Sequence, residues 1–216
     1  MNIVIINGNP DPGNIQFDSY LLGYQLKLHK TGHYVKTFLL RDMIKGFAKE
    51  GTETEIHLHT GYAANVLNYI IHAVDETDLL VVASPLRQKA LPALVRSVQE
   101  YINRHFQARL SDRTHKWADE VSGRRIPMIG VIIQPEAGTS PQDLLLIRLT
   151  QERLAANIET VMSFMITTNM SVADAVCATF RSFDYRRYIE VTCNDLLEGS
   201  ISRFTGAGEN KSAFQQ

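Results

Sequence analysis

Short apolar runs alternate along this chain with longer segments that repeat apolar residues at helical spacing. The run Asn2–Asn7 (NIVIIN) is mostly β-branched, which is typical of a strand buried on both faces of a sheet. From Phe17 to Leu28 apolar residues recur every three or four positions, which predicts a helix that ends near Gly32. Alternation of these two periods indicates an α/β fold.

The same alternation predicts four further strands and four further helices. The strands are expected at His33–Leu40, Asp78–Ser84, Ile126–Gln134 and Val161–Thr168, and the helices at Ala63–Val74, Leu91–Ile102, Leu144–Ile158 and Tyr185–Ser200. This pattern indicates a mostly parallel sheet with helices on both faces, and right-handed crossovers restrict its topology. Five strands in the order 2-1-3-4-5 give a flavodoxin-like three-layer α/β sandwich. A Rossmann sheet would need a sixth strand and a G-x-G-x-x-G fingerprint, which the first loop lacks.

The length and charge of the chain suit a single cytoplasmic domain. Of its 216 residues, we expect residues 1–204 to form one flavodoxin-like domain and residues 205–216 to form a flexible tail. The formal net charge of -1 gives no field that would attract nucleic acid or an anionic membrane. No apolar stretch approaches the roughly 20 residues that span a bilayer, and no signal peptide is evident. We therefore predict a cytoplasmic protein with neither nucleic acid nor membrane as partner.

Two polar segments interrupt the regular pattern. Arg41–Thr60 joins the second strand to the second helix, and Gln107–Arg125 is a charged stretch that carries Trp117, the only tryptophan. Both are interpreted as long loops, which in compact domains are often functional. His57 and His59 would share one face of an extended segment, but they have no third ligand nearby, so no metal site is predicted. No catalytic side chain is predicted either, since no nucleophile motif is present.

Three loops are expected to meet at the carboxyl edge of the sheet, between the first and third strands, where the strand order reverses. They are Gly8–Ser19, Ser84–Ala90 and Gln134–Thr139. In open parallel sheets this edge is where ligands bind. The candidate binding residues are Asn9, Pro10, Asp11, Asn14, Ser19, Ser84, Pro85, Leu86, Arg87, Gln88, Gln134, Pro135, Glu136 and Gly138.

The first loop, GNPDPGNIQFDS, precedes a helix, and free N–H groups at a helix start attract phosphate. Asn9, Asn14 and Ser19 can donate or orient further hydrogen bonds. The alternative is that the loop only caps the helix, with Asp18 or Ser19 as the capping residue. Asp11 and Asp18 favour that alternative, because carboxylates repel a dianion. The loop alone leaves both interpretations open.

The second and third loops offer different groups. Ser84 and Pro85 give a sharp exit from the third strand, so that the backbone there can face a planar ligand. Arg87 and Lys89 either pair with the phosphates of a nicotinamide cofactor or form a solvated rim. In the third loop Gly138 can approach the edge of a ring, whereas Glu136 is either a site residue or a surface turn residue.

Three stretches, taken in order, resemble the NADPH-dependent FMN reductase family of flavodoxin-like proteins. They are INGNPDPGNIQFDSYLLGYQLKLHKTGHYVKTFLLRDMIK, DETDLLVVASPLRQKALPALVRSVQEYI and IPMIGVIIQPEAGTSPQDLLLIRLTQERLAANIETVMSF. The resemblance implies FMN bound by the first two loops, NADPH or NADH as electron donor and a small-molecule electron acceptor such as a quinone or a flavin. The chemistry would belong to the cofactor, with the protein positioning the ring. It also implies a homodimer.

The chain departs from the family pattern at several positions. Lys89 stands where the family has a glycine that lets the backbone approach the flavin, and Asn14 stands where it has a serine that contacts phosphate. Residues 45–55 lack the cysteine-rich segment of some relatives. Two hypotheses follow. The first is an NAD(P)H-dependent FMN oxidoreductase whose backbone N–H groups near Arg87 and Gln88 stabilise the reduced ring. The second is a binding or assembly protein that has lost FMN and has no redox activity.

Overall fold

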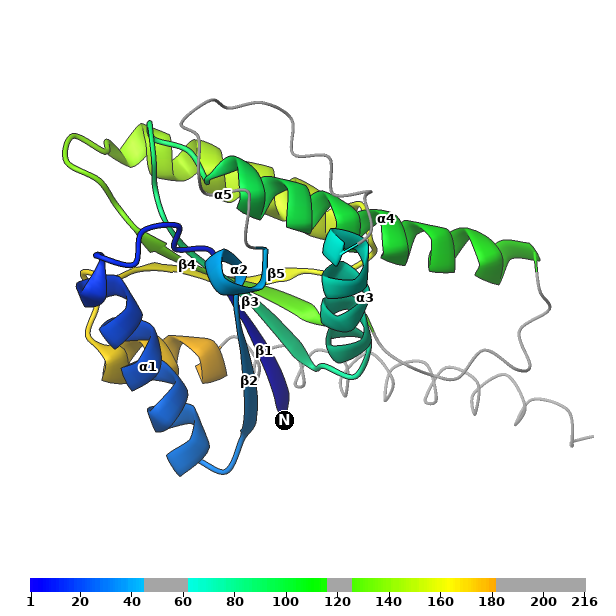
Figure 1. The fold of residues 1–216 in the computed structure, drawn as a ribbon, viewed down its shortest axis with the longest axis horizontal. Helices are drawn as coiled ribbons and strands as arrows, with labels where there is room; N and C mark the ends of the chain where they lie inside the picture. Colours follow the sequence, from blue (N-terminus) through cyan, green and yellow to red (C-terminus); the bar gives the residue numbers. More distant parts are fainter. Residues whose placement is uncertain (45–61, 116–125, 182–216) are drawn as a thin grey trace, which may run out of the picture. The chain divides into compact units, whose positions relative to one another are not determined.

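A computed structural model describes residues 1–44, 62–115 and 126–181 of the chain. Five strands form one parallel sheet in the order β2-β1-β3-β4-β5 (Figure 1). They are β1 (Asn2–Asn7), β2 (Tyr34–Leu39), β3 (Leu79–Pro85), β4 (Met128–Gln134) and β5 (Met162–Thr167). The predicted flavodoxin-like topology is confirmed, with β1 between β2 and β3.

Helices pack on both faces of this sheet (Figure 1). They are α1 (Ile15–Lys30), α2 (Leu40–Met43), α3 (Tyr62–Asp75), α4 (Ala93–His115) and α5 (Pro141–Ala156). Residues of α3, α4 and α5 share one buried apolar cluster with alternate residues of β1, β3 and β4. On the other face, α1 lies against a further helix at 172–181, through a contact between Gly23 and Val172 and a 2.8 Å hydrogen bond between the hydroxyls of Tyr24 and Thr179.

The buried strands follow from their composition. Every residue of β3 and all but the first of β1 are buried, as expected for central strands of a parallel sheet covered on both sides. On α1 the buried positions are Phe17, Leu21, Tyr24 and Leu28, the set that the helical spacing had singled out. Of the helices described, none is long and apolar enough to cross a membrane.

The prediction of a loop beginning at Gln107 is wrong, because α4 continues as a helix to His115. The four-residue spacing of Ile102, Phe106 and Leu110 carries the buried stripe onward, and Phe106 is fully buried. Arg109 also pairs with Asp75 at the end of α3, with 2.6 Å between Nη1 and Oδ1. The helical spacing of the apolar residues was missed because charged residues outnumber them in this segment.

The helix at 172–181 was not predicted. Its first turn is capped by Ser171, whose hydroxyl accepts a hydrogen bond from the backbone N–H of Asp174 and donates one to the Asp174 carboxylate. This pairing resembles a capping box, so the spacing of the two residues was a usable signal.

The chain divides into two units, residues 1–179 and 180–216. The predicted helix at 185–200 and the predicted boundary at 204 lie outside the described residues.

The register of the strands brings their carboxyl ends together. Asn7 pairs with Leu39 on one side and with Ala83 on the other, and Pro85 pairs with Gln134. Gly8 follows directly, and its N–H donates to the carbonyl of Ala83 at 2.7 Å. The loops after β1, β2, β3 and β4 therefore leave the sheet at one edge.

Candidate functional site

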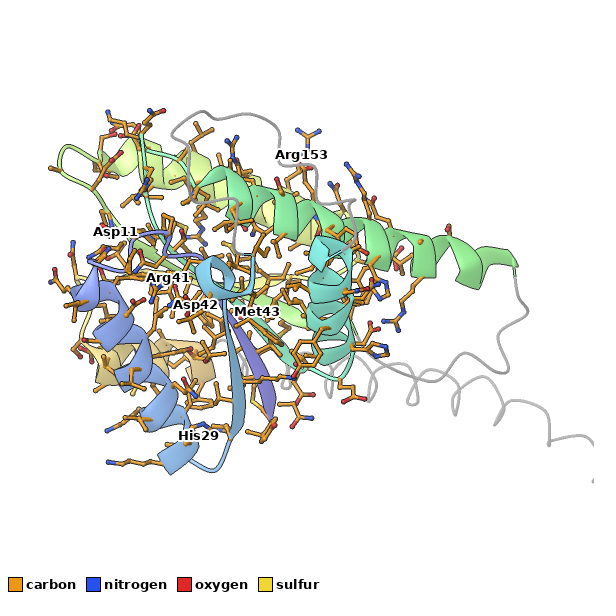
Figure 2. All side chains as sticks on the ribbon, in the orientation of Figure 1. Asp11, His29, Arg41, Asp42, Met43 and Arg153 are labelled. Atoms are coloured by element: carbon orange, nitrogen blue, oxygen red, sulfur yellow. The ribbon has the colours of Figure 1, made fainter. Side chains whose placement is uncertain are left out.

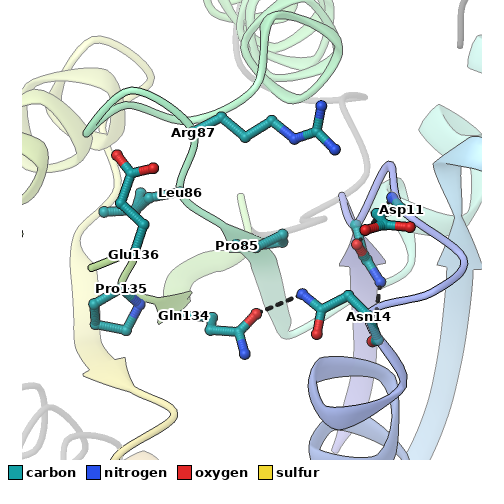
Figure 3. Close-up of a pocket in the computed structure, with 9 residues that line it drawn as sticks. Asp11, Asn14, Pro85, Leu86, Arg87, Gln134, Pro135 and Glu136 are labelled. Atoms are coloured by element: carbon teal, nitrogen blue, oxygen red, sulfur yellow. Dashed lines mark hydrogen bonds between the residues drawn. The ribbon is translucent and has the colours of Figure 1, made fainter.

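A cleft of about 230 Å³ lies where the three predicted loops meet (Figure 3). Its volume is below the roughly 300–1,000 Å³ of typical small-molecule sites, so it encloses part of a nucleotide-sized ligand at most. Whether the lining residues bind a ligand stays a prediction. All nine lining residues were among the predicted site residues, namely Asn9, Asp11, Asn14, Pro85, Leu86, Arg87, Gln134, Pro135 and Glu136.

The other five predicted residues do not line this cleft. Pro10 lies in the first loop between two lining residues, and Ser19 is exposed on α1. Ser84 is fully buried, and its hydroxyl donates to the carbonyls of Gly8 and Pro85, so it holds the first two loops together. Gln88 lies at the tip of the second loop and Gly138 at a turn in the third loop.

The first loop is held by asparagine and aspartate side chains of its own and by Asn7 at the end of β1. The Oδ1 of Asn7 accepts from the N–H of Asn9, and the Oδ1 of Asn9 accepts from the N–H of Asp11. Asp11 repeats the pattern and accepts from the N–H of Gly13 at 2.8 Å. Asn14 then caps α1 by accepting from the N–H of Phe17. Such local bonds give the loop a fixed shape without a ligand.

Arg41, in the short helix α2 that follows β2, is a member of this network that the sequence reasoning missed (Figure 2). Its Nη2 lies 2.8 Å from Oδ2 of Asp18, and its Nη1 donates to the carbonyl of Asn9. Burial alone would raise the pKa of Asp18. Hydrogen bonds from Arg41, Asn7 and Asn9, together with the Arg41 charge, outweigh burial and lower that pKa. The Asp18 carboxylate is therefore neutralised within the protein and does not face a ligand as a free charge.

A side-chain hydrogen bond crosses the cleft from the first loop to the third (Figure 3). The Nδ2 of Asn14 donates to Oε1 of Gln134, with 2.6 Å between the two atoms. Asn14 thus uses its oxygen to cap α1 and its nitrogen to reach Gln134. The pair closes the cleft at the end where α1 begins.

The second loop forms a two-residue hairpin. Arg87 and Ala90 exchange both backbone hydrogen bonds, and the residues between them, Gln88 and Lys89, have φ angles of 51° and 59°. Two-residue turns of this kind favour glycine or asparagine, because other side chains are strained at positive φ. The strain coincides with Lys89, the position where the family resemblance leads one to expect glycine.

The hairpin is tied to the third loop and to α5. The backbone N–H of Lys89 donates to the carboxylate of Glu136, and its ammonium lies 3.3 Å from Oδ2 of Asp143. The N–H of Arg87 is used within the hairpin, so it is not available for the ring stabilisation that the sequence had suggested there. The guanidinium of Arg87 is exposed, forms no ion pair with a described residue, and extends across the cleft toward the side that carries Asp11 (Figure 3).

The cleft fits the two ends of FMN unequally. Pro85, Leu86 and Pro135 give an apolar surface for a planar ring, and the Gln134 amide offers a donor beside it. The phosphate end lacks a cradle, because within residues 8–18 each non-proline N–H except that of Gln16 already has an acceptor. The residues present therefore do not fit the phosphate of FMN.

Metal ligation finds no support in the part of the chain that the structure describes. No group of three or more His, Cys, Asp or Glu side chains is placed to hold an ion among residues 1–44, 62–115 and 126–181. His57, His59 and Trp117 lie outside these ranges.

No protein-family model and no curated protein matches the chain. Among solved structures, it is similar to RosB with bound 8-demethyl-8-formylriboflavin-5′-phosphate, at 12% identity, covering 100% of this chain and 91% of that one, with a TM-score of 0.52. A flavone reductase matches at 12% identity over 86% of this chain and 58% of its own, with a TM-score of 0.52. An FMN-dependent NADH-azoreductase from Bacillus anthracis in complex with FMN matches at 10% identity over 88% of this chain and 99% of its own, with a TM-score of 0.47. At these identities the similarity establishes the flavodoxin-like fold alone.

Proposed function

We propose that this chain is an NAD(P)H-dependent flavin oxidoreductase whose flavin ring lies in the cleft between the first, second and third loops. The observation that carries the proposal is the convergence of nine lining residues from three distant segments at the edge where the strand order reverses. Support also comes from RosB, a protein of similar fold described with a bound flavin phosphate. The bound flavin would supply the electron chemistry.

The residues of the chain have positioning roles in this proposal. Pro85, Leu86 and Pro135 would pack against the ring, and Gln134 would contact its polar edge. Arg87 would meet the diphosphate of the nicotinamide donor, because its guanidinium is free of ion pairs with the described residues and a guanidinium pairs well with phosphate oxygens. Lys89 is less suited to that role, since its ammonium is next to Asp143.

Reconstitution tests the proposal. The purified protein is mixed with riboflavin or FMN, and flavin fluorescence and the melting temperature are followed, since a ligand that binds only the native state must raise that temperature. NADPH or NADH oxidation is then measured with a quinone. We expect flavin binding and flavin-dependent oxidation of the nicotinamide. Arg87→Ala should raise KM for the nicotinamide by about tenfold without weakening the binding of uncharged riboflavin. Arg104→Ala, which removes an exposed arginine from α4, should change neither.

A second function, a binding or assembly protein without redox activity, is favoured by a specific observation. Most N–H groups of the first loop already have acceptors within the protein, and the carboxylates of Asp11 and Glu136 line the cleft. Protein that binds neither riboflavin nor FMN and oxidises no NADPH would support this function over the enzyme. The small-molecule acceptor and the homodimer implied by the family resemblance belong to the first proposal, and gel filtration at several protein concentrations tests the homodimer.

A further inference from the structure

We infer that the cleft selects a flavin with an uncharged ribityl tail, such as riboflavin, over the phosphorylated form FMN; this inference rests on the proposed function. Three properties of the cleft favour the uncharged tail, namely the few free N–H donors of the first loop, the negative charge of the lining, and the hydrogen-bonding groups of the lining.

All but one of the backbone donors that a phosphate would need are already in use, the exception being the N–H of Gln16. A phosphate at a helix start is held by backbone N–H groups that have no partner within the protein. Here the N–H of Asn9 donates to the side chain of Asn7 at the end of β1, those of Asp11 and Gly13 donate to side-chain oxygens within the loop, and that of Phe17 donates to Asn14. Proline occupies two further positions and supplies no N–H. A phosphate would have to break several of these bonds to gain its own.

The charge on the cleft lining also opposes a phosphate. Among the described residues, Asp11 and Glu136 are the carboxylates of the lining and Arg87 is its one cation, which leaves a formal charge of -1. Two nearby cations do not correct this balance, because Arg41 is paired with Asp18, and Lys89 lies beside Asp143. A phosphate monoester brings a further -1.5 to -2 charges at pH 7, into a site whose sum is already negative.

The same groups suit a chain of hydroxyls. A hydroxyl both donates and accepts, so it can donate to the Asp11 carboxylate and accept from the amide of Asn14 or Gln134, which line the cleft together. The volume of about 230 Å³ favours a shorter ligand as well. A ligand with a polyol tail needs neither free backbone N–H groups nor a cationic lining.

Isothermal titration of the full chain with riboflavin, FMN and inorganic phosphate tests this selectivity. We expect riboflavin to bind at least about tenfold more tightly than FMN. Inorganic phosphate alone should give no heat of binding. Because the penalty on FMN is repulsion between charges, FMN affinity should rise with ionic strength, whereas riboflavin affinity should not change. FMN that binds as tightly as riboflavin would overturn the inference while leaving the proposed function intact. If neither flavin binds, both are overturned.

A matched pair of variants separates charge from shape. Asp11→Asn keeps the oxygen that accepts from Gly13 and removes the charge, so it should tighten FMN several-fold and shift the preference between the two flavins toward FMN. Glu100→Gln removes an equal charge from the exposed face of α4 and should change neither affinity. If Asp11→Asn weakens both flavins equally or leaves the preference between them unchanged, the inference is wrong.

Discussion

At the scale of single residues, Asn14 links the fold to the candidate site. Its side-chain oxygen caps α1 and its nitrogen donates to Gln134 across the cleft. The sequence had offered two interpretations of the first loop, a phosphate site or a helix cap. The geometry supports the cap, although the capping residue is Asn14 and not Asp18 or Ser19. Three residues that can all cap a helix stand close together here, and only the course of the chain after Pro12 decides which one does.

Variants of Asn14 should separate these two roles. Asn14→Ser keeps a capping oxygen but cannot reach Gln134, whereas Asn14→Ala loses both bonds. We expect Asn14→Ala to lower the free energy of unfolding by about 1–2 kcal/mol, and Asn14→Ser by about half of that. Urea denaturation measures both values. Equal stability of the alanine variant and the wild-type protein would contradict the double role.

Lys89 should be replaceable by glycine with a gain in stability. Its φ of 59° strains any side chain, and its ion pair with Asp143 is weak because the Lys89 side chain is 53% exposed. Lys89→Gly removes the strain and keeps the backbone bond to Glu136, so the free energy of unfolding should rise by about 0.5–1 kcal/mol. Lys89→Ala is the control, since it loses the ion pair but keeps the strain. A glycine variant less stable than the alanine variant would disprove this account.

The lowered pKa of Asp18 predicts a pH dependence of stability. Since the folded pKa is below the unfolded one, the contribution is fully present above about pH 4 and disappears as the pH falls through the folded pKa. Asp18→Asn leaves Arg41 without its partner and should cost about 1–3 kcal/mol at pH 7. The difference between wild type and variant should shrink below about pH 4. Thermal unfolding across this range provides the measurement, and a constant difference would refute the prediction.

At the scale of elements, the period of apolar residues located every strand, most of α1, α3 and α5, and the first part of α4. It failed where polar residues dominate an exposed helix, as in α4 beyond Gln107, and where a helix is short, as at 172–181. The amide pair of Gln99 and Gln151, buried between α4 and α5, was equally invisible, because it joins residues far apart in the sequence. Local pattern identifies an element, but it does not reveal which polar groups meet after packing.

Gly130 in β4 gives a prediction at this scale. A Cβ at this position would lie 2.3 Å from the ring of Phe164 in β5, a distance that no packed carbon pair tolerates. Gly130→Ala should therefore lower the free energy of unfolding by about 1–3 kcal/mol. Combining it with Phe164→Leu should recover part of that loss, because the smaller side chain leaves room for the methyl group. Additive losses in the double variant, measured by denaturant unfolding, would show that the two residues do not compete for space.

At the scale of the whole molecule, the sequence was enough to predict the strand order and the edge where the candidate site forms. Right-handed crossovers and the reversal of strand order bring the three loops together whatever their exact residues are. The contribution of Arg41 could not be predicted, since it depends on the placement of α2 beside the first loop. The acceptors of the backbone N–H groups in the first loop could not be predicted either. The same loop sequence can bind an anion through these groups or use them in hydrogen bonds within the protein.

Chemical-shift mapping with riboflavin tests the central claim most directly. In ¹H–¹⁵N spectra of the labelled chain, addition of riboflavin should shift the backbone signals of residues 9–14, 85–90 and 134–139. The side-chain amides of Asn14 and Gln134 should shift as well, because their hydrogen bond lies at the cleft. Shifts confined to another part of the chain, such as the Asp75, His105 and Arg109 cluster, or no shifts at all, would contradict a flavin site between the three loops.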